Sequence, residues 1–232
     1  MKRLLSAILA FYAVLTAFAA DNDLVGKNIV FLGDSYVRNH RRPSSETWHA
    51  KAAANLGMNY VNCGRNGSSI AFDRTKDGFG PAMTERYKTE IPDSADYIVI
   101  IAGHNDTGFV GNDTEQKAWT EFCRGLDTLL DGLRSKFPDA RLAFVTPWAV
   151  DRPGFKEVNA RIIEACGLRG IPVLDMAALG VIKVNNPEFR VKYFQGPNDT
   201  AHLNAEGHDL LVPLGEAFIR LVGMESPKSQ SK

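Results

Sequence analysis

The sequence has no excess of either charge. Its 232 residues include 27 basic and 27 acidic side chains, so the formal net charge is zero. No long basic run interrupts this balance, and a nucleic acid or an acidic membrane surface is therefore not expected as the main partner. With 44% apolar residues, the composition is that of an ordinary globular domain. The balance of charge favours a small neutral or mixed substrate.

Cysteine is scarce and widely spaced. The three cysteines are Cys63, Cys123 and Cys166, and no two of them form a CxxC pair. This spacing argues against a zinc site and against a dense disulfide framework. Each cysteine falls in an apolar pattern, which predicts a thiol in the core. One disulfide between two of the three stays open, and the sequence does not assign it.

One apolar run opens the chain. Lys2 and Arg3 precede an apolar segment that starts at Leu4 and closes on Ala17-Phe18-Ala19. This is the pattern of a secretory signal peptide with an A-x-A cleavage site, and the run is short for a bilayer span of roughly 20 residues. We expect a signal peptide over 1–19, export to the periplasm or the medium, and no stable membrane insertion afterwards. An uncleaved membrane anchor is the alternative.

The rest of the chain, residues 20–232, reads as a single domain with a polar tail. Its short apolar runs do not alternate with polar residues, as expected for parallel strands buried on both faces. The five runs begin at Ile29, Tyr60, Tyr97, Arg141 and Ile171. Helical patterns lie between these runs, over 45–56, over 115–137 and through Phe155 to Ile163, and a last one runs from 210 to 221. The alternation predicts an α/β fold, a three-layer α/β/α sandwich around a five-stranded parallel sheet.

Four segments belong to no predicted element: 64–80, 103–113, 147–154 and 187–201. The first three come directly after a strand, and the last leads into the final helix. Ligands of an open parallel sheet bind beyond the carboxyl ends of its strands, so these segments are where chemistry is expected.

Polar residues in and beside these segments suit acyl transfer. A serine hydroxyl needs an imidazole to take its proton, and the imidazole needs a carboxylate to fix its tautomer. Ser35 comes after the first strand, and Asp199 precedes His202 by three residues, a spacing that lets one turn present both side chains. The backbone N–H groups of Ser35 and Gly67 and the Asn105 amide are the available donors to an oxyanion.

Four motifs carry these residues in order along the chain: Gly33-Asp34-Ser35, Asn62-x-Gly64-x-x-Gly67, Gly103-x-Asn105-Asp106 and Asp199-x-x-His202. Together they resemble the four blocks of the SGNH or GDSL hydrolases. The resemblance implies a flavodoxin-like fold and a hydrolase without a cofactor. It implies that Ser35 is the nucleophile, His202 the base and Asp199 its orienting partner, and that Ser35, Gly67 and Asn105 form the oxyanion hole.

Three further residues are candidates for lining the substrate site. His104 is bulkier than the small residue often found at this place in the family, and it could narrow or polarise the site. Trp148 could offer a flat indole face to a sugar ring, although a loop residue closing over the core is the ordinary interpretation. Arg65 could bind a polar leaving group.

The remaining polar residues are expected to be structural. Asp34 and Asp106 read as acceptors that brace turns. His40, His49 and His208, the last placed within the final helix, read as surface or internally bonded histidines. The i, i+4 histidine pair typical of helical zinc sites is absent, so no metal is expected.

These observations predict an exported serine esterase that removes a small acyl group, with acetyl on a carbohydrate as the preferred substrate. Family members of this size act on acetylated sugars, short-chain esters, lysophospholipids or thioesters. A lipase, lysophospholipase or thioesterase with Phe72 and Phe109 along an acyl groove is the main alternative. A glycan-binding protein without turnover is the other.

Overall fold

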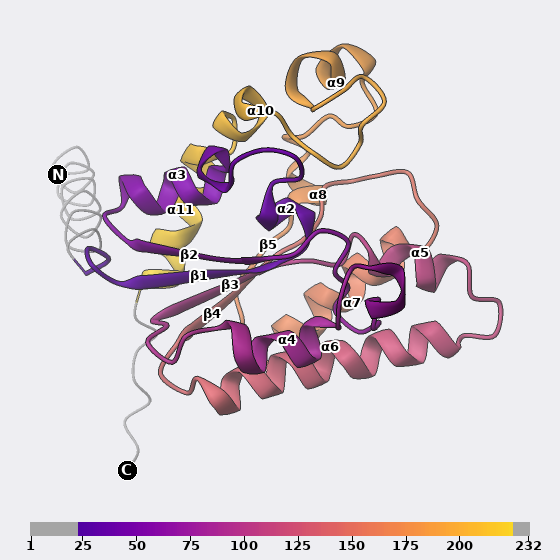
Figure 1. The fold of residues 1–232 in the computed structure, drawn as a ribbon, viewed down its shortest axis with the longest axis horizontal. Helices are drawn as coiled ribbons and strands as arrows, with labels where there is room; N and C mark the ends of the chain where they lie inside the picture. The colour runs from indigo at the N-terminus through magenta and orange to yellow at the C-terminus, as the bar shows by residue number, and fades with distance from the viewer. Residues whose placement is uncertain (1–22, 225–232) are drawn as a thin grey trace, which may run out of the picture.

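The structure, a computed structural model, describes residues 23–224, and the predicted signal peptide lies outside them. Its centre is a parallel sheet of five strands in the order β2-β1-β3-β4-β5 (Figure 1). The strands are β1 (Asn28–Gly33), β2 (Asn59–Gly64), β3 (Tyr97–Ile101), β4 (Arg141–Val145) and β5 (Val173–Leu174). The five predicted strands and the flavodoxin-like three-layer fold are therefore confirmed.

Two helical layers bury the sheet, as Figure 1 shows. On one face lie α3 (Trp48–Asn55) and α11 (Val212–Gly223), and on the other lie α4 (Met83–Glu90), α6 (Lys117–Lys136) and α7 (Phe155–Gly167). Alternate residues of β1 enter opposite cores, since Ile29 and Phe31 pack with the first layer and Val30 and Leu32 with the second. This explains why the strand reads as a continuous apolar run.

Several short helices were not predicted from the pattern. They are α4, α5 (Asp106–Gly111), α8 (Met176–Leu179) and α9 (Pro187–Tyr193). Two of them, α5 and α9, occupy segments expected to be irregular. The prediction that His208 lies in the final helix is also wrong, because α10 (Ala205–Asp209) ends before α11 begins. A proline at Pro213 near the start of α11 suits a new helix rather than a continuing one.

The register aligns the carboxyl ends of three neighbouring strands, β2, β1 and β3. Gly33 pairs with Gly64 on one side and with Ile101 on the other. A Cβ on Gly33 would lie 2.3 Å from the Ile101 carbonyl oxygen and 2.4 Å from a methyl group of Val37. The absence of a side chain there lets the helix after β1 fold back closely against the sheet.

The segment from α9 to α10 lies beyond this edge of the sheet (Figure 1). Phe194 and Leu203 are buried in the first core and anchor it. Within the described residues, no helix is long and apolar enough to cross a membrane. All three cysteines are free thiols, with Cys63 and Cys166 buried and Cys123 half-buried.

Candidate active site

Ser35 is the first residue of α2 (Ser35–Arg38), a single turn that starts one residue after β1. The preceding residue supplies the cap: Asp34 Oδ1 accepts a hydrogen bond from the Tyr36 N–H at 2.8 Å. The Ser35 hydroxyl is therefore not used as a helix cap, and it remains available for other contacts.

His202 joins Ser35 to Asp199. The distance from His202 Nε2 to Ser35 Oγ is 3.0 Å, and His202 Nδ1 lies 3.0 Å from Asp199 Oδ2. An ionised carboxylate only accepts hydrogen bonds, so Nδ1 carries the ring proton and Nε2 accepts from the serine hydroxyl. The structure thus brings together the three residues that the sequence singled out, across 167 residues of chain. This geometry allows the imidazole to take the serine proton.

A tight turn fixes Asp199 in place. Its Oδ1 accepts hydrogen bonds from the N–H groups of Ala201 at 2.8 Å and His202 at 2.9 Å. Partial burial alone would raise the pKa of Asp199, but the bonds from the His202 ring and from these N–H groups outweigh it and lower the pKa. The carboxylate stays ionised and able to hold the imidazole.

Of the three groups expected to donate to the oxyanion, two are free of hydrogen bonds within residues 23–224 and one is already hydrogen-bonded. The N–H groups of Ser35 and Gly67 donate to no other group within residues 23–224. Asn105 Nδ2, in contrast, donates to the Ser68 carbonyl at 2.9 Å and to Asp34 Oδ2 at 3.3 Å. The longer of these two bonds is the weaker one, so it is the one that a stronger acceptor would displace.

Asp34 and Asp106 brace the loops around the site, as expected. Asp106 accepts hydrogen bonds from the N–H groups of Ile70 and Ala71, which tie the loop after Gly67 to α5. Both carboxyls are fully buried, and desolvation raises the pKa of each to about 7.

His104 lies behind the site rather than on its surface. Its side chain is 7% exposed, with Nε2 2.7 Å from Arg152 Nη1 and Nδ1 3.0 Å from the Tyr36 hydroxyl oxygen. A guanidinium only donates, so Nε2 is the acceptor and Nδ1 carries the proton. Burial, together with the Arg152 charge, lowers the pKa of His104 to about 3. The prediction that His104 lines the substrate site is corrected: it connects α2 to Arg152.

Trp148 does not offer an open face to a sugar, which corrects the second lining prediction. It is 4% exposed and stacks on Tyr36, with ring centroids 4.1 Å apart and planes 8° from parallel. Its Nε1–H donates to the Thr200 carbonyl at 2.9 Å. Trp148 therefore links the residue after Ser35 to the residue after Asp199.

Arg65, the third candidate for lining the site, makes an ion pair with the helix α4. Its guanidinium donates to Glu90 Oε1 at 2.7 Å, and Glu90 also binds the buried Arg86. The helix α4 thus holds Arg65, whose side chain is 43% exposed, and its binding of a leaving group stays a prediction.

Sequence reasoning missed His40. Its ring stacks on His202, with centroids 4.5 Å apart and planes 29° from parallel. Partial burial, followed by the like charges of His202 and Arg41, lowers the pKa of His40. No local motif marks this histidine, because its partner lies far away in the sequence.

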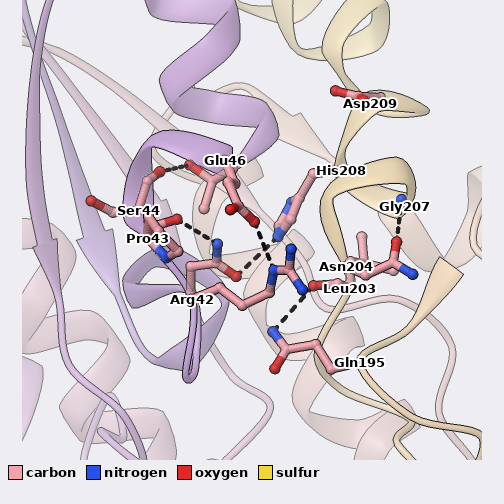
Figure 2. Close-up of polar contacts among 12 residues, drawn as sticks. Arg42, Pro43, Ser44, Glu46, Gln195, Leu203, Asn204, Gly207, His208 and Asp209 are labelled. Atoms are coloured by element: carbon pink, nitrogen blue, oxygen red, sulfur yellow. Dashed lines mark hydrogen bonds and ion pairs between the residues drawn. The ribbon is translucent and has the colours of Figure 1, made fainter.

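His208 is buried, as expected of a structural histidine, but it joins two distant segments. Figure 2 shows it directed from α10 toward the segment that holds Arg42 and Pro43. Its Nδ1 accepts from the Trp48 N–H at 3.3 Å, so Nε2 carries the proton and donates to Asn39 Oδ1 at 3.4 Å. Burial lowers the pKa of His208 to about 3.

Two cavities lie near Ser35, one lined by Asn105 and the other by His202, although Ser35 itself lines neither. The Asn105 cleft, of about 740 Å³, includes Asn105, Phe72, Phe109 and Arg152. The His202 cleft, of about 490 Å³, includes His202 and Asp199 and lies between His40-Arg41 and 195–198. No group of three metal-ligating side chains occurs in the described part of the chain.

The model of the GDSL-like lipase/acylhydrolase family matches residues 31–210 of this sequence. The chain belongs to this family. It is a carboxylic ester hydrolase, and the resemblance stated from the four motifs is confirmed.

Solved structures agree with the fold. One that is 25% identical has a TM-score of 0.74, with 86% of this chain and 99% of the other covered. The acetyl xylan esterase AlAXEase is 16% identical, with a TM-score of 0.60 over 80% and 96% of the two chains. A family two carbohydrate esterase from Clostridium thermocellum in complex with cellohexaose is 18% identical, with a TM-score of 0.62 over 86% and 65%. Among curated proteins, none matches the sequence.

Proposed function

We propose that this protein is an exported serine esterase that removes acetyl groups from a carbohydrate through an acyl-enzyme intermediate. The observation that carries the proposal is the continuous relay from Ser35 through His202 to Asp199, with 3.0 Å at each contact. The contact between Ser35 Oγ and His202 Nε2, and that between His202 Nδ1 and Asp199, join the atoms that take part when serine attacks as a nucleophile. The second contact also holds the imidazole in the required tautomer.

In the first half-reaction, Ser35 Oγ attacks the ester carbonyl carbon while His202 Nε2 takes the hydroxyl proton. The imidazolium is stabilised by the ionised Asp199 and then gives that proton to the departing alcohol oxygen. In the second half-reaction, water attacks the acyl carbon and His202 accepts one of its protons. The bond between Ser35 Oγ and the acyl carbon then breaks, Ser35 Oγ takes that proton from His202, and acetic acid leaves.

The oxyanion formed in both steps needs fixed donors. The N–H groups of Ser35 and Gly67 supply two of them, and Asn105 supplies a third when the oxyanion replaces Asp34 Oδ2 at the longer of its two contacts. Losing one such donor typically costs ~2.7–4 kcal/mol of barrier stabilisation.

Two observations support a carbohydrate substrate. Solved structures with this fold include an acetyl xylan esterase and an esterase active on acetylated mannans. Six of the eight residues that line the cleft beside His202 have polar side chains, which can form hydrogen bonds with a hydroxylated alcohol. Export rests on the N-terminal sequence pattern alone.

A lipase, lysophospholipase or thioesterase activity is the second candidate, and one observation favours it. Phe72 stacks on Phe109 with centroids 4.3 Å apart, and both line the larger Asn105 cleft. These rings could accommodate an acyl chain longer than acetyl. A third candidate, a glycan-binding protein without turnover, would leave Ser35 unreactive.

The test is hydrolysis of 4-nitrophenyl acetate and of a long-chain 4-nitrophenyl ester by the wild type, Ser35→Ala and Asp199→Asn. We expect preference for acetate and loss of at least a thousandfold in kcat for both variants. Ser69→Ala and Asp209→Asn are the matched controls. Ser69 is a buried serine near the site whose hydroxyl has no hydrogen-bond partner, and Asp209 makes an ion pair with Lys51.

Each contrary result removes a different part of the proposal. Activity that survives Ser35→Ala would exclude Ser35 as the nucleophile. A strong preference for the long chain would replace the deacetylase with the lipase. No labelling of Ser35 by a fluorophosphonate would favour the binding protein.

A further inference from the structure

The two clefts beside Ser35 stand in different relations to the reacting atoms. One contains Asn105, a donor for the carbonyl oxygen, and the other contains His202, the group that returns the proton. When the ester cleaves, the bond between the acyl carbon and the alcohol oxygen breaks, Ser35 Oγ holds the acyl carbon, and the alcohol oxygen takes the proton from His202 Nε2. The departing oxygen must lie within hydrogen-bond distance of that nitrogen. The alcohol part of the substrate therefore lies on the side of His202.

The walls of the His202 cleft carry donors that the protein itself does not use. Arg41 and Asn198 make no hydrogen bond or ion pair with any other residue in 23–224. Both side chains are exposed at the cleft. A guanidinium and a primary amide between them can donate to several oxygen atoms of one ligand. This combination suits the closely spaced hydroxyl and ring oxygens of a sugar.

The cleft is also held in shape. On one wall, Asn39 in the left-handed conformation donates from Nδ2 to the Pro43 carbonyl at 2.7 Å, and it accepts from His208. On the other wall, the backbone N–H of Gln195 donates to the His202 carbonyl at 2.9 Å. The side-chain amide of Gln195 donates to the Leu203 carbonyl at 3.2 Å (Figure 2). A site whose walls are fixed before binding loses less conformational entropy when the ligand arrives.

His40 and His202, which stack on each other, both line the cleft. His40 covers one side of the base, so a ligand in the cleft reaches His202 along its edge, where Nε2 lies.

We propose that the His202 cleft binds the sugar ring from which the acyl group is removed, and that Arg41 and Asn198 bind its oxygen atoms. This inference rests on the proposed function and specifies where its substrate binds. The Asn105 cleft, on this assignment, faces the acyl side and takes no part in recognising the sugar.

The experiment compares two substrates in each variant. The first is the acetylated oligosaccharide that the wild type hydrolyses fastest, and the second is 4-nitrophenyl acetate, which has no sugar. For the double variant Arg41→Ala/Asn198→Ala, we expect the ratio of the two kcat/KM values to fall at least tenfold, through KM for the oligosaccharide. Arg41 has φ 59°, and alanine has the same Cβ, so the substitution adds no backbone strain.

The control is Lys117→Ala, an exposed cation in the Asn105 cleft, for which the ratio should stay within twofold. Calorimetric binding of the same oligosaccharide to inactive Ser35→Ala should weaken in parallel when Arg41 and Asn198 are replaced. An unchanged ratio in the double variant, or a larger loss in Lys117→Ala, would overturn the assignment while leaving the esterase intact. Turnover of 4-nitrophenyl acetate without turnover of any acetylated oligosaccharide would instead remove the carbohydrate part of the proposed function.

Discussion

Replacing Trp148 by phenylalanine removes one hydrogen bond and keeps an aromatic ring beside Tyr36. The lost bond is the 2.9 Å contact from Nε1–H to the Thr200 carbonyl, in the loop between Asp199 and His202. The stack on Tyr36, the neighbour of Ser35, can persist in part because phenylalanine is also planar. The variant therefore separates the loop contact from most of the core packing.

The magnitude depends on the surroundings of the bond. A neutral hydrogen bond contributes about 0.5–1.5 kcal/mol, and Thr200 is exposed, so its carbonyl can bind water once the indole is gone. We take about 1 kcal/mol for the bond. The smaller ring adds about 1 kcal/mol for lost packing around a side chain that is 4% exposed. If the bond mainly orients the loop that carries His202, its loss lowers kcat by about fivefold.

The assay is urea unfolding together with kcat and KM on 4-nitrophenyl acetate. We expect the free energy of unfolding to fall by about 2 kcal/mol and kcat by about fivefold, with KM changed less than twofold. Trp148→Leu, which also removes the stack, should lose more of both. A Trp148→Phe enzyme with the expected loss of stability but the kcat of the wild type would refute the reasoning, because Trp148 would then be a core residue only.

Three other predictions address the loops and the thiols. Gly67→Ala should lower kcat at least tenfold, because Gly67 has φ 70° and the added Cβ would lie 2.2 Å from Phe79. Adding Phe79→Ala should restore part of the rate, because it removes the steric clash but leaves the backbone strain. Burial raises the pKa of Asp106 from 3.8 to about 7, so its stabilising contribution is full below about pH 4 and is lost as pH rises through about 7. Between pH 5 and pH 8, the free energy of unfolding measured in urea should therefore fall less for Asp106→Asn than for the wild type. A thiol reagent should modify at most Cys123 in the native protein and all three cysteines after unfolding. If only one cysteine reacts in the unfolded, unreduced protein, the other two form a disulfide.

The sequence was sufficient to predict the sheet and the order of the site motifs. The strands are recognisable because both faces are buried, and the triad candidates because they lie after strand ends at short spacings. Ser35 and His202 meet because the loops that leave the strands of a parallel sheet gather at its carboxyl edge. The helices α5 and α9 were missed since each is seven residues or shorter, too short for an apolar period to appear.

The surroundings of the site were predicted less well, and the reason is contact over long separations. Trp148 and His104 look like lining residues in a loop, but their partners Tyr36, Arg152 and Thr200 cover them. The stack of His40 on His202 could not be foreseen either, because no pattern along the chain relates the two. Motif spacing predicts which groups share an edge of the sheet, whereas burial depends on side chains that no motif contains.

The separation of 167 residues between Ser35 and His202 has a consequence for how the protein becomes active. The strand that precedes Ser35 and the two strands beside it are complete by Ile101, whereas the base lies on a segment after the last strand. A chain emerging from the ribosome thus carries an unactivated serine until nearly its whole length has been made. Ester hydrolysis is therefore a reporter of the last step of assembly, and not of sheet formation.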